Sequence, residues 1–249
     1  MKFTFALLGS MLLVALSSAA EETGFVPMFD GHSLSGWKQH GGEARYTIEG
    51  DAIVGMSVAN TSNSFLCTER EYGDFILEVE LKVDNELNSG IQIRSHVYDK
   101  ATELELKNAV GEMETYSIPA DRVHGYQVEI DPSDRAWSGG IYDEARREWL
   151  YNLEGDDHRD ARQAFRRNDW NHYRIEAVGP AIKTWINGVP VADLTDDVDA
   201  SGLIALQVHS VDDHLAGKQV RWRNVRIKVL DGTEHAERPT RDAASTPDP

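Results

Sequence analysis

The stretch Gly125-Tyr126-Gln127-Val128-Glu129-Ile130-Asp131 alternates apolar and polar residues, as a half-buried β-strand does. Successive side chains of a strand point to opposite faces of the sheet. One face of this strand is therefore apolar and suited to a core. The other face carries one amide and two carboxylates, Gln127, Glu129 and Asp131. A strand that merely faces solvent does not need two carboxylates in a row, so this polar face is a candidate site.

Two further segments have the same alternation. In one of them Gln92 and Arg94 lie opposite two isoleucines, and in the other Gln207 and His209 lie opposite aliphatic residues. If the three strands are neighbours with their polar faces aligned, a single sheet face gathers seven polar side chains. These are Gln92, Arg94, Gln127, Glu129, Asp131, Gln207 and His209.

Short β-rich segments separated by turn residues continue along most of the chain, with hardly any helical periodicity. Asn187-Gly188 is the strongest hairpin signal. The pattern predicts an all-β fold, a sandwich or jelly roll of two antiparallel sheets with a concave ligand face. Val97 to Val123 is polar and without a clear period, so we expect a long loop that rims the site. Asp156 to Asn168 is charged and is expected to be a short exposed helix.

The N-terminus has the features of an export signal. Lys2 precedes an apolar run from Phe3 to Leu16, which is short for a membrane span, and the small residues Ser18 and Ala20 suit a signal peptidase. We expect residues 1–20 to be a signal peptide and the mature protein to be exported, periplasmic or secreted, without stable membrane insertion. An uncleaved anchor is the alternative.

Composition limits the remaining choices. The 249 residues carry a net charge of −17, which repels nucleic acid and anionic lipid and suits a neutral ligand or a bound cation. Cys67 is the single cysteine of the chain, so an internal disulfide is excluded. We expect one domain over residues 21–230. Residues 231–249, rich in Ala, Thr, Pro and charge, are expected to form a disordered tail.

Several motifs follow one another along the chain: Phe29-Asp30-Gly31, Gly36-Trp37, Asn88-Ser89-Gly90-Ile91-Gln92-Ile93-Arg94, Tyr126 to Asp131, Gly139-Gly140-Ile141-Tyr142, Thr184 to Gly188 and Gly202 to His209. In these motifs the chain resembles the 3-keto-disaccharide hydrolase family, from about Gly24 to Leu230. The resemblance implies a concanavalin-A-like jelly roll and a small carbohydrate substrate, a glycoside already oxidised to a ketone at C3. No nucleotide cofactor is expected.

A ketone at C3 acidifies the proton on C2, so a base can start a β-elimination that expels the aglycone, and water can then complete a net hydrolysis. His209 is the first candidate for the base because histidine titrates near neutral pH, and Glu129 is the alternative. Arg94 is expected to stabilise the enolate oxygen, and Asp131 completes the catalytic set. Substrate contacts are expected from Gln92, Gln127, Gln207, Tyr142 and Trp137.

Glu129, Asp131 and His209 could instead gather a divalent cation, because oxygen ligands with one imidazole suit Ca²⁺, Mn²⁺ or Zn²⁺. A third possibility is an ion network with Arg94 that has no catalytic role.

Two other functions stay open at this point. Glu129-x-Asp131-x-x-Asp134 is similar to the acidic strand of jelly-roll glucanases, which predicts a direct glycosidase, although Pro132 breaks the strand before Asp134. A non-catalytic carbohydrate-binding module would use the amides and aromatic residues alone.

Overall fold

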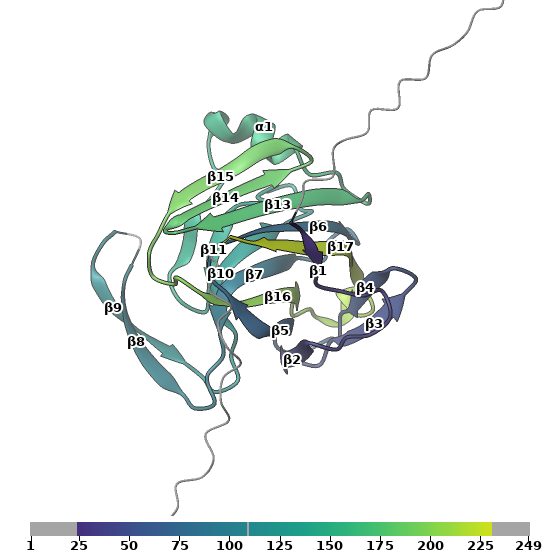
Figure 1. Ribbon diagram of the computed structural model, residues 1–249, viewed down its shortest axis with the longest axis horizontal. Helices are drawn as coiled ribbons and strands as arrows, with labels where there is room; N and C mark the ends of the chain where they lie inside the picture. Colours follow the sequence, from purple (N-terminus) through teal and green to yellow (C-terminus); the bar gives the residue numbers. More distant parts are fainter. Residues whose placement is uncertain (1–23, 109, 231–249) are drawn as a thin grey trace, which may run out of the picture.

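The computed structural model describes residues 24–108 and 110–230, and two large antiparallel sheets make up most of this part of the chain (Figure 1). Sheet A contains, in spatial order, β15 (Val189–Thr195), β14 (Ala181–Ile186), β13 (Asn171–Val178), β6 (Phe75–Val83), β17 (Gln219–Val229), β4 (Ala52–Met56) and β3 (Arg45–Glu49), with β1 (Val26–Pro27) paired to β17. Sheet B contains β12 (Glu148–Tyr151), β11 (Ile141–Glu144), β10 (His124–Ile130), β7 (Ser89–His96), β16 (Gly202–Val208), β5 (Ser64–Tyr72) and β2 (Trp37–Gly41).

The core lies between the two sheets and follows the predicted alternation. On β6 of sheet A, Leu77, Val79 and Leu81 are at most 1% exposed, and on β10 of sheet B, Tyr126 and Val128 are fully buried. Apolar burial on this scale is the main favourable contribution to folding. The predicted all-β, concanavalin-A-like jelly-roll sandwich is confirmed.

Local turn chemistry explains the clearest hairpin. Ile186 and Val189 are paired across Asn187-Gly188, and both turn residues have positive φ, 52° and 82°. Asparagine and glycine tolerate this region of backbone space best, as a tight hairpin turn requires. The hairpin predicted between β14 and β15 is therefore confirmed.

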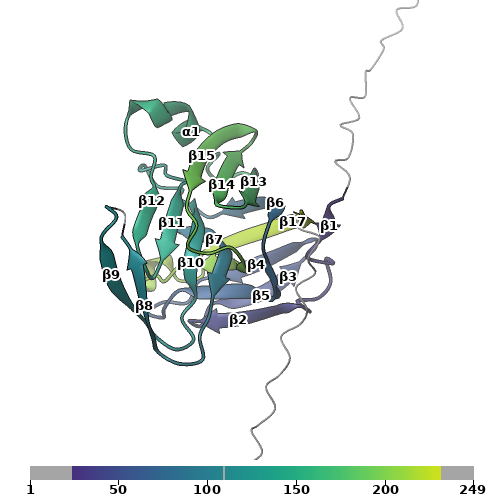
Figure 2. The same cartoon turned by 60° about the vertical axis from the view of Figure 1, so that its left-hand side comes forward.

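The segment from Val97 to Val123 differs from the predicted loop, because most of it pairs with itself. β8 (Thr102–Lys107) and β9 (Met113–Ile118) form a separate two-stranded hairpin beside β10 and β11 (Figure 1 and Figure 2). The end of the segment then crosses the outer face of sheet B. There Val123 is buried in a small apolar cluster with Phe65 and Cys67.

Helical structure is limited to short pieces in the described ranges. The charged segment near Asp156 forms a 3₁₀ turn, Asp156–His158, and one short helix, α1 (Arg159–Gln163), and most of its side chains are exposed, as predicted. A second 3₁₀ turn spans Asp213–Leu215. Between residues 24 and 230, leaving aside residue 109, we find no helix of the length and apolarity that a membrane span needs. The predicted signal peptide and tail lie outside the described residues.

Candidate functional site

Three glutamines form a hydrogen-bonded row on the outer face of sheet B. Gln127 on β10 is directly opposite Gln92 on β7, and Gln207 comes from β16 on the other side of β7. Oε1 of Gln127 accepts hydrogen bonds from Nε2 of Gln92 at 2.8 Å and from Nε2 of Gln207 at 2.7 Å. The structure therefore brings together the three amides that the alternation predicts on one face.

Gly90 makes room for this row. A Cβ atom at Gly90 would lie 2.5 Å from Cδ of Gln127, which is closer than real side chains approach. The glycine therefore lets Gln127 lie flat across β7 and reach Gln207 on the far side.

Glu129 is the next residue along the same face, and three side chains hold its carboxylate. Nε2 of Gln127 donates to Oε2 at 2.9 Å, while Nδ2 of Asn88 and Nη2 of Arg135 donate to Oε1 at 2.7 Å and 2.9 Å. Glu129 is 3% exposed. Burial raises the pKa of Glu129 to about 7, although the hydrogen bonds from Asn88 and Gln127 and the charge of Arg135 oppose the rise. A carboxyl group that titrates near neutral pH is suited to acid–base catalysis.

Arg135 joins Glu129 to Asp131. Its Nε donates to Oδ2 of Asp131 at 2.7 Å, and its guanidinium lies 4.9 Å from the ring centroid of Trp137 and 5.1 Å from that of Trp149. Burial alone would raise the pKa of Asp131, but hydrogen bonds from Ser133 and Arg135 outweigh it and lower the pKa. Asp131 is therefore ionised and holds the guanidinium of Arg135 in place beside Glu129.

An open hollow of about 480 Å³ adjoins this end of the row and is lined in part by Arg135 and Trp137. Tyr142 lies beside the same group, because it is opposite Gln127 in the register and its ring centroid is 5.2 Å from that of Trp149. The predicted substrate residues Tyr142 and Trp137 thus lie next to the acidic end of the row, with partly exposed rings.

A second buried carboxyl group, Glu144, stands on the same face two residues after Tyr142. It accepts hydrogen bonds from Nδ2 of Asn63 at 3.3 Å and from Arg122, whose guanidinium also covers the ring of Phe65. Burial raises the pKa of Glu144, and the charge of Arg122 opposes the rise. These contacts close the face at the end away from Arg135.

His209 lies just beyond the end of β16, near Asn63 and Glu144. Its Nδ1 is 2.7 Å from the carbonyl oxygen of Ser210. A carbonyl only accepts, so Nδ1 must carry the proton, and in the neutral ring Nε2 is the unprotonated nitrogen. Among the described residues no hydrogen bond reaches this Nε2. Nε2 of His209 is thus left to a ligand, and the structure does not bring this histidine into contact with Glu129.

The predicted alignment of Arg94 with Gln92 is wrong. Both pairings of β7, with β10 and with β16, shift register near this residue, and Arg94 has φ 45°. This β-bulge turns Arg94 away from the glutamine row, and Ser95 takes its place, with Oγ 3.3 Å from Oε1 of Gln92.

Arg94 itself is buried at the end of the sandwich. Its Nε donates to the carbonyl of Gly73 at 2.9 Å, Nη1 to that of Gly179 at 2.7 Å, and Nη2 to Oδ1 of Asp74 at 2.8 Å. The side chain therefore links the two sheets. It lies away from Glu129, so it does not fit the predicted role at the enolate oxygen. The cation beside Glu129 is Arg135.

The predicted metal ligands Glu129, Asp131 and His209 do not form one group. The guanidinium of Arg135 lies between the two carboxylates, and His209 lies on the far side of the row. No cluster of three or more His, Cys, Asp or Glu side chains suited to a metal ion occurs within residues 24–108 and 110–230. These residues do not fit a divalent cation at this place.

The sequence interpretation missed two site residues, Glu144 and Arg135, and only Glu144 could have been predicted from the alternation of its strand. Glu144 shares the alternation of Tyr142 in its strand, so the same argument applied there would have found it. Arg135 lies in the turn after β10, where periodicity places no side chain.

Comparison with known proteins identifies the family that the sequence motifs resemble. Residues 24–228 match the family described as the 3-keto-alpha-glucoside-1,2-lyase-like domain. A search of curated protein sequences found no match.

Two solved structures show the fold. One, from Parabacteroides distasonis and named as a glycosyl hydrolase, is 18% identical with a TM-score of 0.52, and the match covers 84% of this chain and 94% of that one. The other, a Bacillus subtilis protein with a galectin-like fold, is 11% identical with a TM-score of 0.54, and the match covers 82% of this chain and 94% of that one. At these identities the likeness concerns the fold.

Proposed function

The chain belongs to the 3-keto-alpha-glucoside-1,2-lyase-like family, and we propose that it is a carbohydrate-active enzyme that cleaves the glycosidic bond of 3-keto-glycosides, including 3-keto-disaccharides. One observation carries the proposal. Glu129 is a buried carboxyl group with a pKa of about 7, held at the end of a hydrogen-bonded row of amides and beside partly exposed aromatic rings.

Glu129 is the base in this proposal. Three donors point at its carboxylate, an arrangement that favours the ionised, proton-accepting form. It removes the proton from C2 of the 3-keto sugar, and the electron pair delocalises into the C3 carbonyl as an enolate. Nitrogen atoms of Arg135 not engaged by the two carboxylates donate to that oxygen, which is the role predicted for Arg94.

Collapse of the enolate forms the C1–C2 double bond and breaks the bond from C1 to the glycosidic oxygen. We assign to His209, protonated at Nε2, the transfer of a proton to that leaving oxygen. Hydration reverses these roles: neutral His209 takes a proton from the water that adds to C1, and Glu129 returns a proton to C2. The net reaction is hydrolysis.

The partly exposed rings beside the amide row bind the sugar. Trp137, Trp149 and Tyr142 offer flat apolar surfaces to the ring. Gln92, Gln127 and Gln207 are at most 3% exposed and hydrogen-bonded to one another, so they position Glu129.

A direct glycosidase fits this site less well. It needs two carboxyl groups flanking one bond, but Asp134 of the Glu129-x-Asp131-x-x-Asp134 pattern is fully exposed and pairs with Arg167 at 2.9 Å. Asp131 is held by Arg135 and by the turn. A binding module without activity would have no use for a buried carboxyl group with a pKa near neutrality.

The test is turnover of a 3-keto disaccharide in D₂O, followed by NMR. We expect deuterium at C2 of the 3-keto sugar product, because the proton on Glu129 exchanges with solvent. Borohydride reduction of the ketone should give an inert disaccharide. Cleavage of the reduced or plain disaccharide without exchange at C2 would contradict the elimination, and absence of any turnover would favour a binding module. A parallel reaction with EDTA is expected to run at the same rate, because Arg135 takes the position of a cation.

A further inference from the structure

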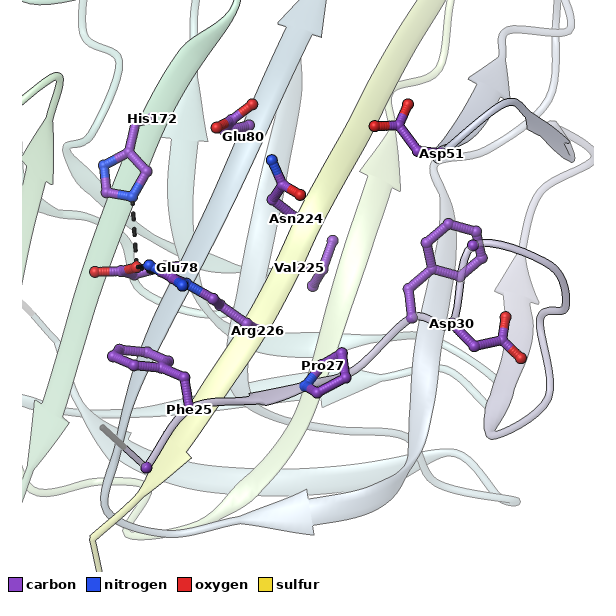
Figure 3. A pocket seen from close by; sticks show the side chains of 13 residues that line it. Phe25, Pro27, Asp30, Asp51, Glu78, Glu80, His172, Asn224, Val225 and Arg226 are labelled. Atoms are coloured by element: carbon purple, nitrogen blue, oxygen red, sulfur yellow. Dashed lines mark hydrogen bonds and ion pairs between the residues drawn. The ribbon is translucent and has the colours of Figure 1, made fainter. Parts of the chain in front are cut away.

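A separate pocket of about 730 Å³ lies on the outer face of sheet A (Figure 3). This face and the glutamine row are on opposite sides of the sandwich, because the core lies between the two sheets. The floor of the pocket is formed by β6 and β17, one wall by His172 of β13, and the other wall by residues 24–31. The volume is in the range of small-molecule sites in proteins.

The charges on the floor are balanced by neighbours. Glu78, 6% exposed, accepts hydrogen bonds from Arg226 at 2.6 Å and from Arg174 at 2.8 Å, and Glu80 pairs with Arg223 at 2.7 Å. Burial would raise the pKa of Glu78, but the hydrogen bonds from Arg226 and Arg174 lower it, so the carboxylate stays ionised. The paired floor gives neither an anion nor a cation a free partner of opposite charge.

A β-bulge raises an amide from this floor. The pairing of β17 with β6 shifts register between Arg223 and Arg226, and Asn224 within the shift has φ 50°. Figure 3 shows Asn224 beside Glu80, with Asp51 on the facing hairpin. Bulges of this kind often re-aim a side chain at a functional site. Asn224 is exposed, and its amide is both a donor and an acceptor.

The wall formed by residues 24–31 is apolar except for Asp30 near its end, and pairing with β17 holds it in place. Phe25, Pro27 and Phe29 line the pocket, and the guanidinium of Arg226 lies 4.9 Å from the ring centroid of Phe25. β1 holds this segment against β17, and the backbone nitrogen of Met28 donates to the carbonyl of Val225 at 2.9 Å. The phenylalanine rings are thus held in place before any ligand binds.

We propose that this pocket is a second, non-catalytic binding site for an uncharged saccharide. Flat apolar rings on one side match the C–H face of a sugar, and the amide and carboxylate oxygens of Asn224, Glu80 and Asp51 match its hydroxyl groups. Asp51 has no ion-pair partner among the described residues, and it and the carboxylates around it repel an anion. The site does not include Glu129, so it stands or falls independently of the proposed reaction. A glycan bound there would hold the protein to a carbohydrate surface while the opposite face acts.

The test uses maltose and cellobiose, two unoxidised disaccharides, with saturation-transfer NMR and ¹⁵N-labelled protein. Phe25→Ala removes the ring, and Asn224→Gly removes the amide while glycine keeps the positive φ. Each is expected to weaken binding about tenfold or more, the loss expected for a buried aromatic or hydrogen-bonding contact. Val26→Ala is the matched control, because Val26 is exposed, follows Phe25 directly in the chain and does not line the pocket.

We expect at least one disaccharide to bind the wild type, Val26→Ala and Glu129→Gln alike, and to shift the side-chain amide signals of Asn224. All three surface variants should turn over 3-keto substrate at the wild-type rate. Absence of binding by both disaccharides, or binding that is lost in Glu129→Gln and kept in Phe25→Ala and Asn224→Gly, would overturn the proposal. The Asn224 signals in the wild type decide the matter if a variant fails to fold.

Discussion

Arg135 covers Glu129: its Nη2 lies 2.9 Å from Oε1 of the glutamate, and the exposed fraction of the side chain is 41% for Arg135 but 4% for Glu129. A sugar that approaches from the neighbouring hollow would therefore meet the guanidinium and its two tryptophans before it meets Glu129, the proposed base. The first contact is with a cation that suits a carbonyl oxygen.

The first prediction concerns the pH dependence of the rate. In the proposed reaction Glu129 is the base and works only when it is ionised, so the rate with a 3-keto disaccharide should rise with pH through about 7, the pKa of this group. Glu129→Gln should lower the rate roughly 10²–10⁴-fold and abolish that rise. A rate that instead falls through pH 7 would contradict the role of Glu129 as the base.

The same group should affect stability. The pKa of Glu129 is raised from 4.5 to about 7 in the folded protein, so the folded state binds more protons than the unfolded state between these values. The free energy of unfolding should therefore decrease as the pH rises from 4.5 to 7, by roughly 3 kcal/mol from this residue. Glu129→Gln should lose this dependence in urea denaturation at both pH values. Equal slopes in the two proteins would show that the carboxyl group is not buried as described.

His209 is expected to matter in proportion to the basicity of the leaving group. His209→Ala should slow release of a sugar alcohol roughly 10²-fold or more, because an alkoxide needs a proton to leave. Release of nitrophenol from a nitrophenyl 3-keto-glucoside should change much less. His209→Gln is a conservative control for folding. Equal losses with both substrates would remove His209 from the leaving-group step.

Substitutions of Arg94 and Arg135 should differ in whether they mainly affect stability or rate. Arg94→Met removes the hydrogen bonds that Arg94 donates to Asp74 and to the carbonyl groups of Gly73 and Gly179, and it should lower the free energy of unfolding by about 3 kcal/mol. The folded fraction should keep its rate. Arg135→Met should lower the rate at least tenfold and cost less stability than Arg94→Met, because the Arg135 side chain is 41% exposed and Glu129 keeps its hydrogen bonds from Asn88 and Gln127. Urea denaturation and initial rates distinguish these outcomes, and the reverse pattern would restore Arg94 to the site.

Export can be checked on the mature protein. The apolar run after Lys2 and the small residues before Glu21 predict cleavage after Ala20. Intact mass and N-terminal sequencing of protein recovered outside the cytoplasm should show a chain that begins at Glu21. A full-length chain in the membrane fraction would contradict this.

The alternation of apolar and polar residues was enough to predict the strands and the glutamine row. Each strand's period of two fixes which face a side chain lies on, and the pairing register then brings the amides of neighbouring strands together. Gln92 and Gln127 are opposite one another on paired strands, so two correct periods place both amides on one face. The sandwich follows from many such strands, and the hairpin at Asn187-Gly188 from its turn residues.

The errors lie where the period of two stops applying. A bulge adds one residue to β7 and reverses the face of Arg94. No residue type in that segment predicts the bulge. His209 falls one residue beyond the end of β16, so the strand no longer fixes its direction. Arg135 reaches Glu129 only through the shape of a turn. Side chains on loops depend on tertiary geometry, which a local pattern does not contain.

The bulge at Arg94 has a consequence for how the family could diversify. It removes a positive charge from the sheet itself, and the cation beside Glu129 is carried by the turn between β10 and β11. The amide row and the positive charge therefore lie on different parts of the fold. The amides are on paired strands of sheet B, whereas Arg135 is on the turn between β10 and β11. A relative with a different turn could keep the sheet and the glutamines yet present another charge to its substrate. Exchange of one short loop would then change substrate preference without any repacking of the sandwich.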